Sequence, residues 1–319
     1  MTNDKSNIIV SICCITYNHA SFIRKALDGF LMQEPPTGVS ADEPWYEILI
    51  HDDASTDGTT EIIKEYAAKY PDKVFPLYER ENQYSKGHIA DIDMYNYKRA
   101  KGKYIAYCEG DDFWIIPDKL KRQIDFMESH LDYSICFHDY KVYDEREKQM
   151  YWSKDALAFR EIKHLSPDGT DISLDEYFNG LFGQPLTMIF RLSSYDFKWY
   201  KRYKYYRDTH EIYHLLKAGK GYWMNFDGGV HIRHQGGVAG GLTRLDFCYV
   251  SLPIDREFFW KTLDPHAKQQ YLGTLNVCVR LLARDHLLQA IWCMILSFLL
   301  TGHPHSIKRN IEAIKNARK

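Results

Sequence analysis

The stretch KYIAYCEGDDFW, residues 103–114, decides how the fold of this chain is interpreted. It joins an apolar run, with the pattern of a buried strand, to three acidic residues within four positions, Glu109, Asp111 and Asp112. A helix cap needs one carboxylate, whereas three adjacent carboxylates repel one another and shift each other's pKa unless a cation neutralises them. We therefore expect a divalent cation here, because Mg²⁺ and Mn²⁺ are held by carboxylates together with water and phosphate oxygens.

Strand and helix patterns alternate on both sides of this stretch. Short apolar runs typical of strands are followed by segments whose apolar residues recur three and four positions apart, the spacing of an amphipathic helix. This alternation predicts an α/β layer structure with a mainly parallel sheet and right-handed crossovers. We expect strands at 7–16, 45–51, 74–79, 103–108, 133–138 and 183–190, and helices over 19–33, 55–72, before 102 and over 117–130, with Thr56 or Asp57 capping the second helix.

Polar side chains follow three of the predicted strands. Ligands of such sheets bind at the carboxyl ends of the strands, so these side chains should meet at one edge. Asp and Asn are also ordinary turn and cap residues, and for any single position that explanation is at least as good. The residues are Thr16, Tyr17, Asn18 and His19 after the first strand, His51, Asp52 and Asp53 after the second, and the acidic triplet after the fourth.

Composition and charge exclude several classes of protein. Lys and Arg together number 41 against 43 Asp and Glu, so the chain offers no basic surface for nucleic acid. Its seven cysteines include no CxxC pair and no metal-ligand spacing, which indicates reduced thiols in a cytoplasmic protein. The N-terminus has no cationic segment before its apolar run, so we expect a first strand there rather than a signal peptide.

No phosphate-cradling glycine loop accompanies the expected cation. Neither GxxxxGK(S/T) nor GxGxxG follows the first strand, which removes the usual support for a P-loop NTPase or a dinucleotide dehydrogenase. The remaining common use of a cation in such a domain is to neutralise a diphosphate leaving group. The base and ribose would then be held at the ends of the first two strands.

Three motifs over residues 7–140, ITYNHASFIRKALDGFLMQ, EILIHDDASTDGT and AKGKYIAYCEGDDFWIIPDKLKRQIDFM, together resemble the nucleotide-diphospho-sugar transferases of glycosyltransferase family 2. A weaker resemblance continues to about residue 240. It implies a GT-A catalytic domain over 1–242, with a nucleotide-sugar half at 7–140 and an acceptor half at 141–242, and a helical extension over 243–319. The implied activity is a metal-dependent inverting transfer from a nucleotide diphosphate sugar, expected to be UDP-linked, to a saccharide or lipid-linked saccharide. The implied setting is bacterial surface polysaccharide synthesis (capsule, O-antigen or exopolysaccharide).

The residue roles of that family fall on matching positions of this sequence. Nucleoside contacts are implied at Tyr17 and Asp52, and the DxD motif, which holds the metal and the diphosphate, falls on the acidic triplet. Glu109 stands where Asp is commoner, so Asp111 and Asp112 are the expected ligands of Mn²⁺ or Mg²⁺. Thr16, Asn18 and Asp53 lie beside the nucleoside residues and are further candidates for nucleotide contacts. Asp111 is also expected to contact the nucleotide. Glu109 and Trp114 are expected on the donor or acceptor side, and Trp114 is expected to pack beneath the carboxylates.

The polar loop over residues 79–87 follows the third strand and is well placed to touch the base or ribose. It offers Arg80, Asn82 and Lys86 as candidates. A solvated loop without a binding role is an equally good explanation.

An inverting transfer needs a carboxylate that takes the proton of the acceptor hydroxyl. The family supplies it at the start of a helix about a hundred residues after the DxD motif, which selects Asp208 in YRDTHEIYHLLKAGKGYW, with Glu211 one turn on. A helix cap is the alternative for Asp208. We expect the helix start to keep Asp208 ionised, because the helix dipole favours negative charge there.

The run HIRHQGGVAGG, residues 231–241, resembles the loop that follows the base in this family. His234 would then approach the metal, and Gly236 and Gly237 would let the backbone close over the donor. His231 and Arg233 are further candidates for phosphate contacts. A mobile glycine-rich turn with incidental histidines is the alternative.

The chain becomes helical after residue 245. Its apolar run from Ala290 to Leu300 is shorter than the ~20 residues that span a bilayer. A core helix is the favoured explanation, and a helix on the inner face of the plasma membrane is the rival. The rival draws support from the basic residues that follow, opposed only by Glu312: Lys308, Arg309, Lys315, Arg318 and Lys319.

Two other functions fit the same fold. A sugar nucleotidyltransferase would need a basic, glycine-rich triphosphate loop after the first strand, and CCITYNHASF lacks one. A non-catalytic carbohydrate-binding protein would have a decayed site. The joint presence of Asp52, Asp111, Asp112 and Asp208 speaks against decay.

Overall fold

The computed structural model describes residues 7–87, 89–152, 168–178, 183–237, 243–302 and 304–317. Contacts divide the chain into two compact units. The first comprises Met1–Lys201 and Tyr206–Arg233, and the second comprises Arg202–Tyr205 and His234–Lys319. The expected domain boundary after residue 242 falls within 238–242, outside the described residues, and stays a prediction.

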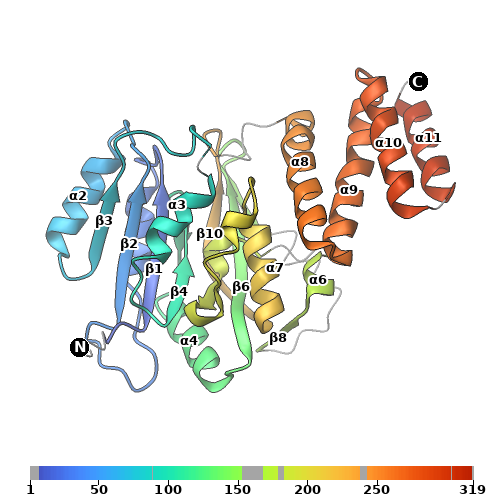
Figure 1. Cartoon of the computed structure of the whole chain (residues 1–319). Helices are drawn as coiled ribbons and strands as arrows, with labels where there is room; N and C mark the ends of the chain where they lie inside the picture. The colour runs from blue at the N-terminus through green and yellow to red at the C-terminus, as the bar shows by residue number, and fades with distance from the viewer. Residues whose placement is uncertain are drawn as a thin grey trace. The chain divides into compact units, whose positions relative to one another are not determined.

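The first unit is built on a sheet that has ten strands among its described residues. One half is parallel throughout and has the order β3-β2-β1-β4 (Figure 1). The other half is mixed, yet most residue pairs in the whole sheet stand in parallel ladders, as the sequence predicts. The strands are β1 (Val10–Thr16), β2 (Tyr46–Asp52), β3 (Val74–Tyr78), β4 (Tyr104–Tyr107), β5 (Phe113–Trp114), β6 (Tyr133–Asp144), β7 (Gln149–Trp152), β8 (Gly169–Ile172), β9 (Ile189–Arg191) and β10 (Lys220–Arg233).

Helices connect these strands where the sequence places apolar residues at helical spacing. In α1, for example, Ile23, Ala26, Leu27 and Phe30 are all buried against the sheet. The cap position of the second helix is Gly58, whose φ of 104° suits glycine, so the prediction of Thr56 or Asp57 as the cap is wrong. The Asp57 carboxylate, one residue earlier, still accepts the Thr59 N–H at 3.0 Å. The helices are α1 (Ile23–Leu31), α2 (Thr59–Lys69), α3 (Ile89–Tyr97), α4 (Lys119–Ser129), α6 (Leu174–Phe178) and α7 (Asp208–Ala218), with short 3₁₀ turns at Pro185–Thr187, Leu192–Ser194 and Tyr200–Arg202.

Three elements differ from the sequence prediction. The strand expected at 183–190 is a 3₁₀ turn beginning at Pro185 followed by the three-residue β9, because proline has no N–H to donate to a ladder. The strand expected at 133–138 runs on to Asp144, since β10 pairs with it along nearly its whole length. The two-residue β5 is too short to leave a periodic signal.

The core of the first unit lies between the parallel strands and the helices packed on them. Every residue of β2 and nearly every residue of β1 is buried, as a parallel strand covered on both faces requires. Trp114 of β5 packs edge-on against Phe30 of α1 with ring centroids 4.9 Å apart. A Cβ on Gly29 would lie 2.9 Å from the Trp114 carbonyl oxygen, so glycine permits this close approach.

The described part of the second unit consists mainly of four helices, α8 (Arg244–Thr262), α9 (Pro265–Leu282), α10 (Leu287–Thr301) and α11 (Pro304–Ala317) (Figure 1). Thr243 caps α8 in a reciprocal box with Asp246, and Asp264 caps α9 by accepting the His266 N–H at 2.9 Å. Among the helices described, none combines the length and apolarity needed to cross a membrane. All seven cysteines of the chain are free and buried.

Candidate active site at the edge of the sheet

The ends of β1, β2 and β4 lie side by side, as the strand-end rule predicts. Thr16 is paired with Asp52 in the parallel ladder, and after β4 the chain continues along β1, where Gly110 N–H donates to Ile15 O at 2.9 Å. A Cβ on Gly110 would lie 2.7 Å from Thr16 Oγ1, so glycine is needed for the acidic loop to approach this closely. The three strand ends therefore meet at one edge of the sheet.

Asp52 and Asp53 are adjacent in sequence, but their carboxylates have different hydrogen-bond partners. The buried Asp52 carboxylate accepts the Ser55 N–H at 3.1 Å and the Thr60 hydroxyl at 2.5 Å. Both oxygens of Asp53 accept backbone N–H groups of the loop after β3, from Gln83 at 2.7 Å and from Tyr84 at 3.0 Å. Asp53 therefore fixes that loop, and its predicted contact with the nucleotide is not favoured by this arrangement.

The first motif is tied to the second by side-chain contacts. Asn18, in the left-handed region with φ 56°, accepts the Thr56 N–H at 2.8 Å, and its own N–H donates to the Ser55 hydroxyl at 2.9 Å. Tyr17 beside it is exposed, so its ring is available to a ligand. The buried Thr16 Oγ1 has no hydrogen-bond partner among the described residues and faces Gly110.

The loop after β3 carries the other candidates for the nucleotide. Arg80 is exposed. Asn82 accepts the Ser85 N–H at 2.6 Å and donates to Asp53 O at 3.3 Å, while Lys86 forms an ion pair with Glu81. Arg80 is thus the candidate whose side chain remains available, and its contact with the nucleotide stays a prediction.

The acidic triplet is compact and electrostatically strained. Glu109, Asp111 and Asp112 each offer a carboxylate oxygen, and these atoms lie within 4.8 Å of one another. Burial and then the charges of Asp111 and Asp112 raise the pKa of Glu109 well above its ordinary value. Hard oxygen donors crowded in this way fit a divalent cation such as Mn²⁺ or Mg²⁺, which would relieve the repulsion.

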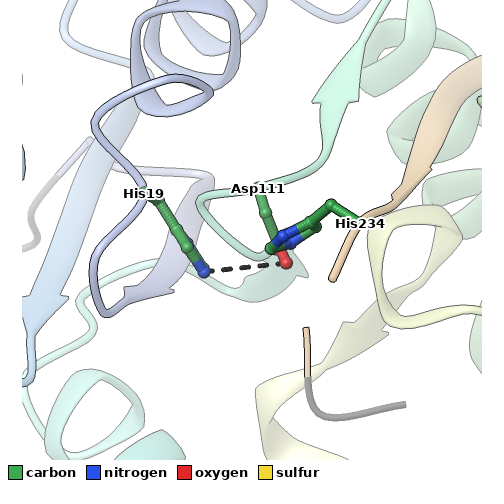
Figure 2. Close-up of side chains that lie close together, drawn as sticks. All are labelled: His19, Asp111 and His234. Atoms are coloured by element: carbon green, nitrogen blue, oxygen red, sulfur yellow. Dashed lines mark ion pairs between the residues drawn. The ribbon is translucent and has the colours of Figure 1, made fainter. Parts of the chain in front are cut away.

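His19 joins this group from the end of β1. Its Nε2 lies 3.6 Å from Asp111 Oδ2. A dashed line joins this pair in Figure 2. Its backbone N–H donates to Thr59 Oγ1 at 2.8 Å, which anchors the turn after β1. In the sequence, the place of His19 in the first motif is the signal that points to the site.

The Asp112 carboxylate is held by two residues of β10. His231 Nδ1 lies 3.1 Å from both of its carboxylate oxygens, and the Ile232 N–H donates to Oδ1 at 2.8 Å. Burial raises the pKa of Asp112, and His231 opposes that rise. His231 thus holds a member of the triplet, and its contact with a phosphate stays a prediction.

The remaining residues of the 231–241 run are placed as follows. Arg233 donates to Tyr151 OH at 3.1 Å and lies 3.9 Å from Asp144, so it has protein partners already. His234, also drawn in Figure 2, directly follows β10 and belongs to the second unit. Its role as a metal ligand, and the roles of Gly236 and Gly237, stay predictions. Residues 238–241 lie outside the described residues.

Asp208 is the first residue of α7, after the cap position at Arg207, so the helix-cap explanation does not account for it. Its Oδ1 accepts the Thr209 N–H at 2.7 Å. Burial nevertheless raises the pKa of Asp208, so the expectation that the helix start keeps it readily ionised is wrong in sign. The charge of Asp208 also adds to the raised pKa of Glu109.

Two further carboxyl groups, one on α7 and one on α3, accept hydrogen bonds from tyrosine hydroxyls. Glu211 on α7 accepts the Tyr97 hydroxyl at 3.0 Å, and Asp93 on α3 accepts the Tyr107 hydroxyl at 2.8 Å. Burial raises the pKa of Asp93 to about 6, and Asp208 adds to that rise. Asp93 escaped sequence reasoning because only the packing of α3 on the sheet brings it here.

Trp114 differs from its predicted place on the donor or acceptor side. Its indole is buried, and Nε1–H donates to Leu186 O at 2.8 Å. The Nζ atom of the fully buried Lys119 lies 3.8 Å from the centre of its ring system. Trp114 therefore supports the acidic loop from the core and does not face a ligand.

The chain matches one family model and is similar to several bacterial proteins. A family model described as Glycosyl transferase family 2 matches residues 11–203. An uncharacterized protein of Mycobacterium tuberculosis is 35% identical over 189 residues, which cover 59% of this chain and 48% of the relative. A protein of Bacillus subtilis named as a candidate teichuronic acid biosynthesis glycosyltransferase, TuaG, is 34% identical over 127 residues, covering 40% and 44%. The chain thus spans about half the length of the curated relatives it matches.

Solved structures resemble the chain over nearly its whole length. Residues 1–349 of S. aureus TarS, solved with UDP-GlcNAc, give a TM-score of 0.55 at 15% identity, covering 98% of this chain and 82% of that fragment. The mannosyltransferase PcManGT from Pyrobaculum calidifontis, solved with GDP-Man and Mn²⁺, gives 0.58 at 14% identity, covering 97% and 86%. At these identities the likeness concerns the fold, which is the GT-A fold with a helical C-terminal region.

Proposed function

The chain belongs to glycosyltransferase family 2, and on that premise we propose that it transfers a sugar, with inversion, from a nucleotide diphosphate donor to a saccharide or lipid-linked saccharide. The observation that carries the proposal is the meeting of Asp52 and the acidic triplet at one edge of the sheet, and Asp208 at the start of α7 is proposed as the base. Asp52 would supply a nucleoside contact, the acidic triplet would supply ligands for the cation that neutralises the diphosphate, and Asp208 would supply the base.

The nucleotide binds at the ends of β1 and β2 in this proposal. The exposed ring of Tyr17 packs on the base, and Asp52, held in place by Ser55 and Thr60, accepts hydrogen bonds from the nucleoside. Arg80 approaches the nucleotide from the loop that Asp53 fixes. UDP is the expected nucleotide, and the TarS complex with UDP-GlcNAc supports that choice by analogy of fold.

The acidic triplet holds the metal in this proposal. Asp111 and Asp112 would bind Mn²⁺ or Mg²⁺, with His234 as a further ligand and Glu109 beside the donor. The ion supplies the positive charge that stabilises the departing diphosphate. His231 and the Ile232 N–H keep Asp112 in one orientation, so its carboxylate needs no reorganisation when the donor arrives.

Asp208 acts as the base. It takes the proton of the acceptor hydroxyl while that oxygen bonds to the anomeric carbon and the bond to the diphosphate breaks. A raised pKa makes the ionised form of Asp208 a stronger proton acceptor, which suits this role. The backbone at Gly236 and Gly237 would close over the donor, as the resemblance implies.

The proposed setting is surface polysaccharide synthesis in a bacterium. The relative named for teichuronic acid synthesis supports it. The proposed acceptor is a free or lipid-linked saccharide. The proposed location is cytoplasmic, with contact to the inner face of the plasma membrane through the C-terminal helices.

Donor turnover tests the proposal. The full chain is mixed with a panel of nucleotide sugars and Mn²⁺, and release of the nucleotide diphosphate is measured with and without saccharide acceptors. We expect metal-dependent release for one donor, lost on chelation and in Asp208→Asn. A chain that neither turns over any nucleotide sugar nor binds a nucleotide in the presence of Mn²⁺ would overturn the proposal.

A further inference from the structure

Helix α10 of the second unit is apolar around nearly its whole circumference. Its sequence, LLQAIWCMILSFLLT, contains no charged residue. A helix of this kind is normally enclosed on all sides, either by a protein core or by lipid. In α10 only one face is buried, so its other face lacks a covering element within the described residues.

The arrangement of large and small side chains on α10 is inverted. The buried positions are occupied by the small residues Ala290, Cys293 and Ser297. The large apolar residues point outward, with exposed fractions of 82% for Leu288, 60% for Trp292, 39% for Ile295 and 69% for Leu299. These four recur at positions i, i+4, i+7 and i+11 and so form a single outer stripe along the helix.

Polar contacts fix the helix in this orientation. Ser297 Oγ donates to Asn276 Oδ1 of α9 at 3.3 Å, and Asn310 of α11 donates to the same oxygen at 3.1 Å. On the side facing α8, the Tyr249 hydroxyl donates to Gln289 Oε1 at 2.7 Å. Rotating α10 about its axis to bury the stripe would break these hydrogen bonds. The packing of the unit therefore sets the outward orientation of the stripe.

Basic residues are exposed on α11 and at the end of α9, the helices that pack against α10. Exposed cations on α11 are Lys308, Arg309 and Lys315, with Glu312 the exposed acid among the described residues of that helix. Arg280 and Arg284 lie at the end of α9, where Asp285 opposes them. This excess of positive charge next to an apolar helix matches a negatively charged lipid surface better than a second copy of the same unit, whose cations would be repelled.

We propose that the second unit docks on an anionic membrane surface through the outer stripe of α10, with the cations of α11 contacting lipid phosphates. Fifteen residues rise about 22 Å, less than the ~30 Å of a hydrocarbon core, so α10 lies in the interface with Trp292 at the level of the headgroups. The docking deepens the proposed function, because a lipid-linked acceptor is presented at such a surface.

Vesicle flotation of the full chain tests the docking. We expect it to float with phosphatidylcholine vesicles that contain phosphatidylglycerol, weakly with phosphatidylcholine alone, and less as salt is raised. Leu288→Gln combined with Leu299→Gln should lower the bound fraction at least about tenfold, and Trp292→Gln by a smaller factor. Lys308→Gln with Arg309→Gln and Lys315→Gln should remove the preference for anionic vesicles.

Trp260→Gln is the matched control. Trp260 on α8 is 61% exposed in the same unit but lies outside the stripe, so its replacement should leave flotation unchanged. Equal losses in the stripe and control variants, or no binding of the wild-type chain to anionic vesicles, would overturn the docking. So would sedimentation in which the double leucine variant turns a dimer into a monomer while vesicle binding persists, because the stripe would then join two copies.

Donor turnover without vesicles separates this inference from the proposed function. The stripe variants should turn over the donor at the wild-type rate in solution, because no residue of the stripe has a role in the proposed reaction. A chain that floats but turns over no nucleotide sugar retains the docking and loses the proposed function. A chain that is active but does not float loses the docking alone.

Discussion

His231 Nδ1 lies 3.1 Å from both carboxylate oxygens of Asp112, across 119 residues of sequence. The contact fastens the acidic loop after β4 to β10, and the adjacent Ile232 N–H adds a third bond to the same carboxylate. Asp112 is buried, so these partners replace the water that an exposed carboxylate would have. Its orientation is therefore set by β10 and not by its own loop.

Removing the imidazole should destabilise the first unit. In His231→Leu the buried carboxylate loses one of its partners, and we expect the free energy of unfolding in urea to fall by about 2 kcal/mol. His231→Gln retains an N–H donor and should lose about half as much or less. A His231→Leu chain as stable as the wild type would show that Asp112 does not depend on this pair.

Replacing Asp111 should abolish metal-dependent nucleotide binding without unfolding the chain. Asp111 is more exposed than Asp112, and His19 Nε2 lies 3.6 Å from its carboxylate, so Asn fits in its place. We expect the rise in melting temperature on adding UDP with Mn²⁺ to be lost in Asp111→Asn, since only a ligand that binds the folded state raises it. Asp72→Asn, an exposed acid before β3, is the control and should respond like the wild type. A full Mn²⁺ response in Asp111→Asn would exclude this residue as a ligand.

Asp208→Asn should separate catalysis from stability. Loss of the base should lower kcat by roughly 10²–10⁴-fold while donor binding stays within about twofold. Because burial raises the pKa of Asp208, the folded state disfavours its ionised form at neutral pH, and Asn should leave the free energy of unfolding equal or higher. Steady-state kinetics and urea unfolding measure the two effects. A large drop in stability together with activity would point to a structural role instead.

Lys119→Met should remove a pH dependence of stability. Burial lowers the pKa of Lys119 to about 7, while an unfolded lysine titrates near about 10.4, so between these values the unfolded state binds a proton that the folded state does not. The stability of the wild type relative to Lys119→Met should therefore rise with pH, by about 2 kcal/mol between about pH 7 and 9. Urea unfolding at both pH values measures it. A constant difference would mean that Lys119 keeps its proton in the folded state.

The nucleotide half of the fold could be predicted because its signals are local. Apolar runs and helical spacing locate β1 to β4 and α1, α2 and α4 within a few residues of their ends, and the strand-end rule correctly brings Thr16, Asp52 and the acidic triplet together. The other half resists prediction because its strands are short or irregular. β5 has two residues, and β9 follows a proline-initiated 3₁₀ turn.

The position of the site could be predicted from the sequence, but the hydrogen-bond partners of its residues could not. The sequence identifies Asp53 and Trp114 as site residues, yet tertiary contacts assign Asp53 to a loop and Trp114 to the core. Asp93 has no sequence signal, because it belongs to a helix whose docking on the sheet alone brings it to Tyr107. The sign of the Asp208 pKa shift was missed for a related reason, since burial outweighs the helix dipole that the sequence made visible.

The sequence by itself determined the order of strands and helices in the nucleotide half, the acidic loop at the end of β4 and the family to which the chain belongs. These follow from hydrophobic periods and motifs that span a few residues each. Only the tertiary structure decided which carboxylates are paired, which are buried and how readily each one ionises. Those properties depend on the local dielectric and on partners such as His231, which approach Asp112 from more than a hundred residues away.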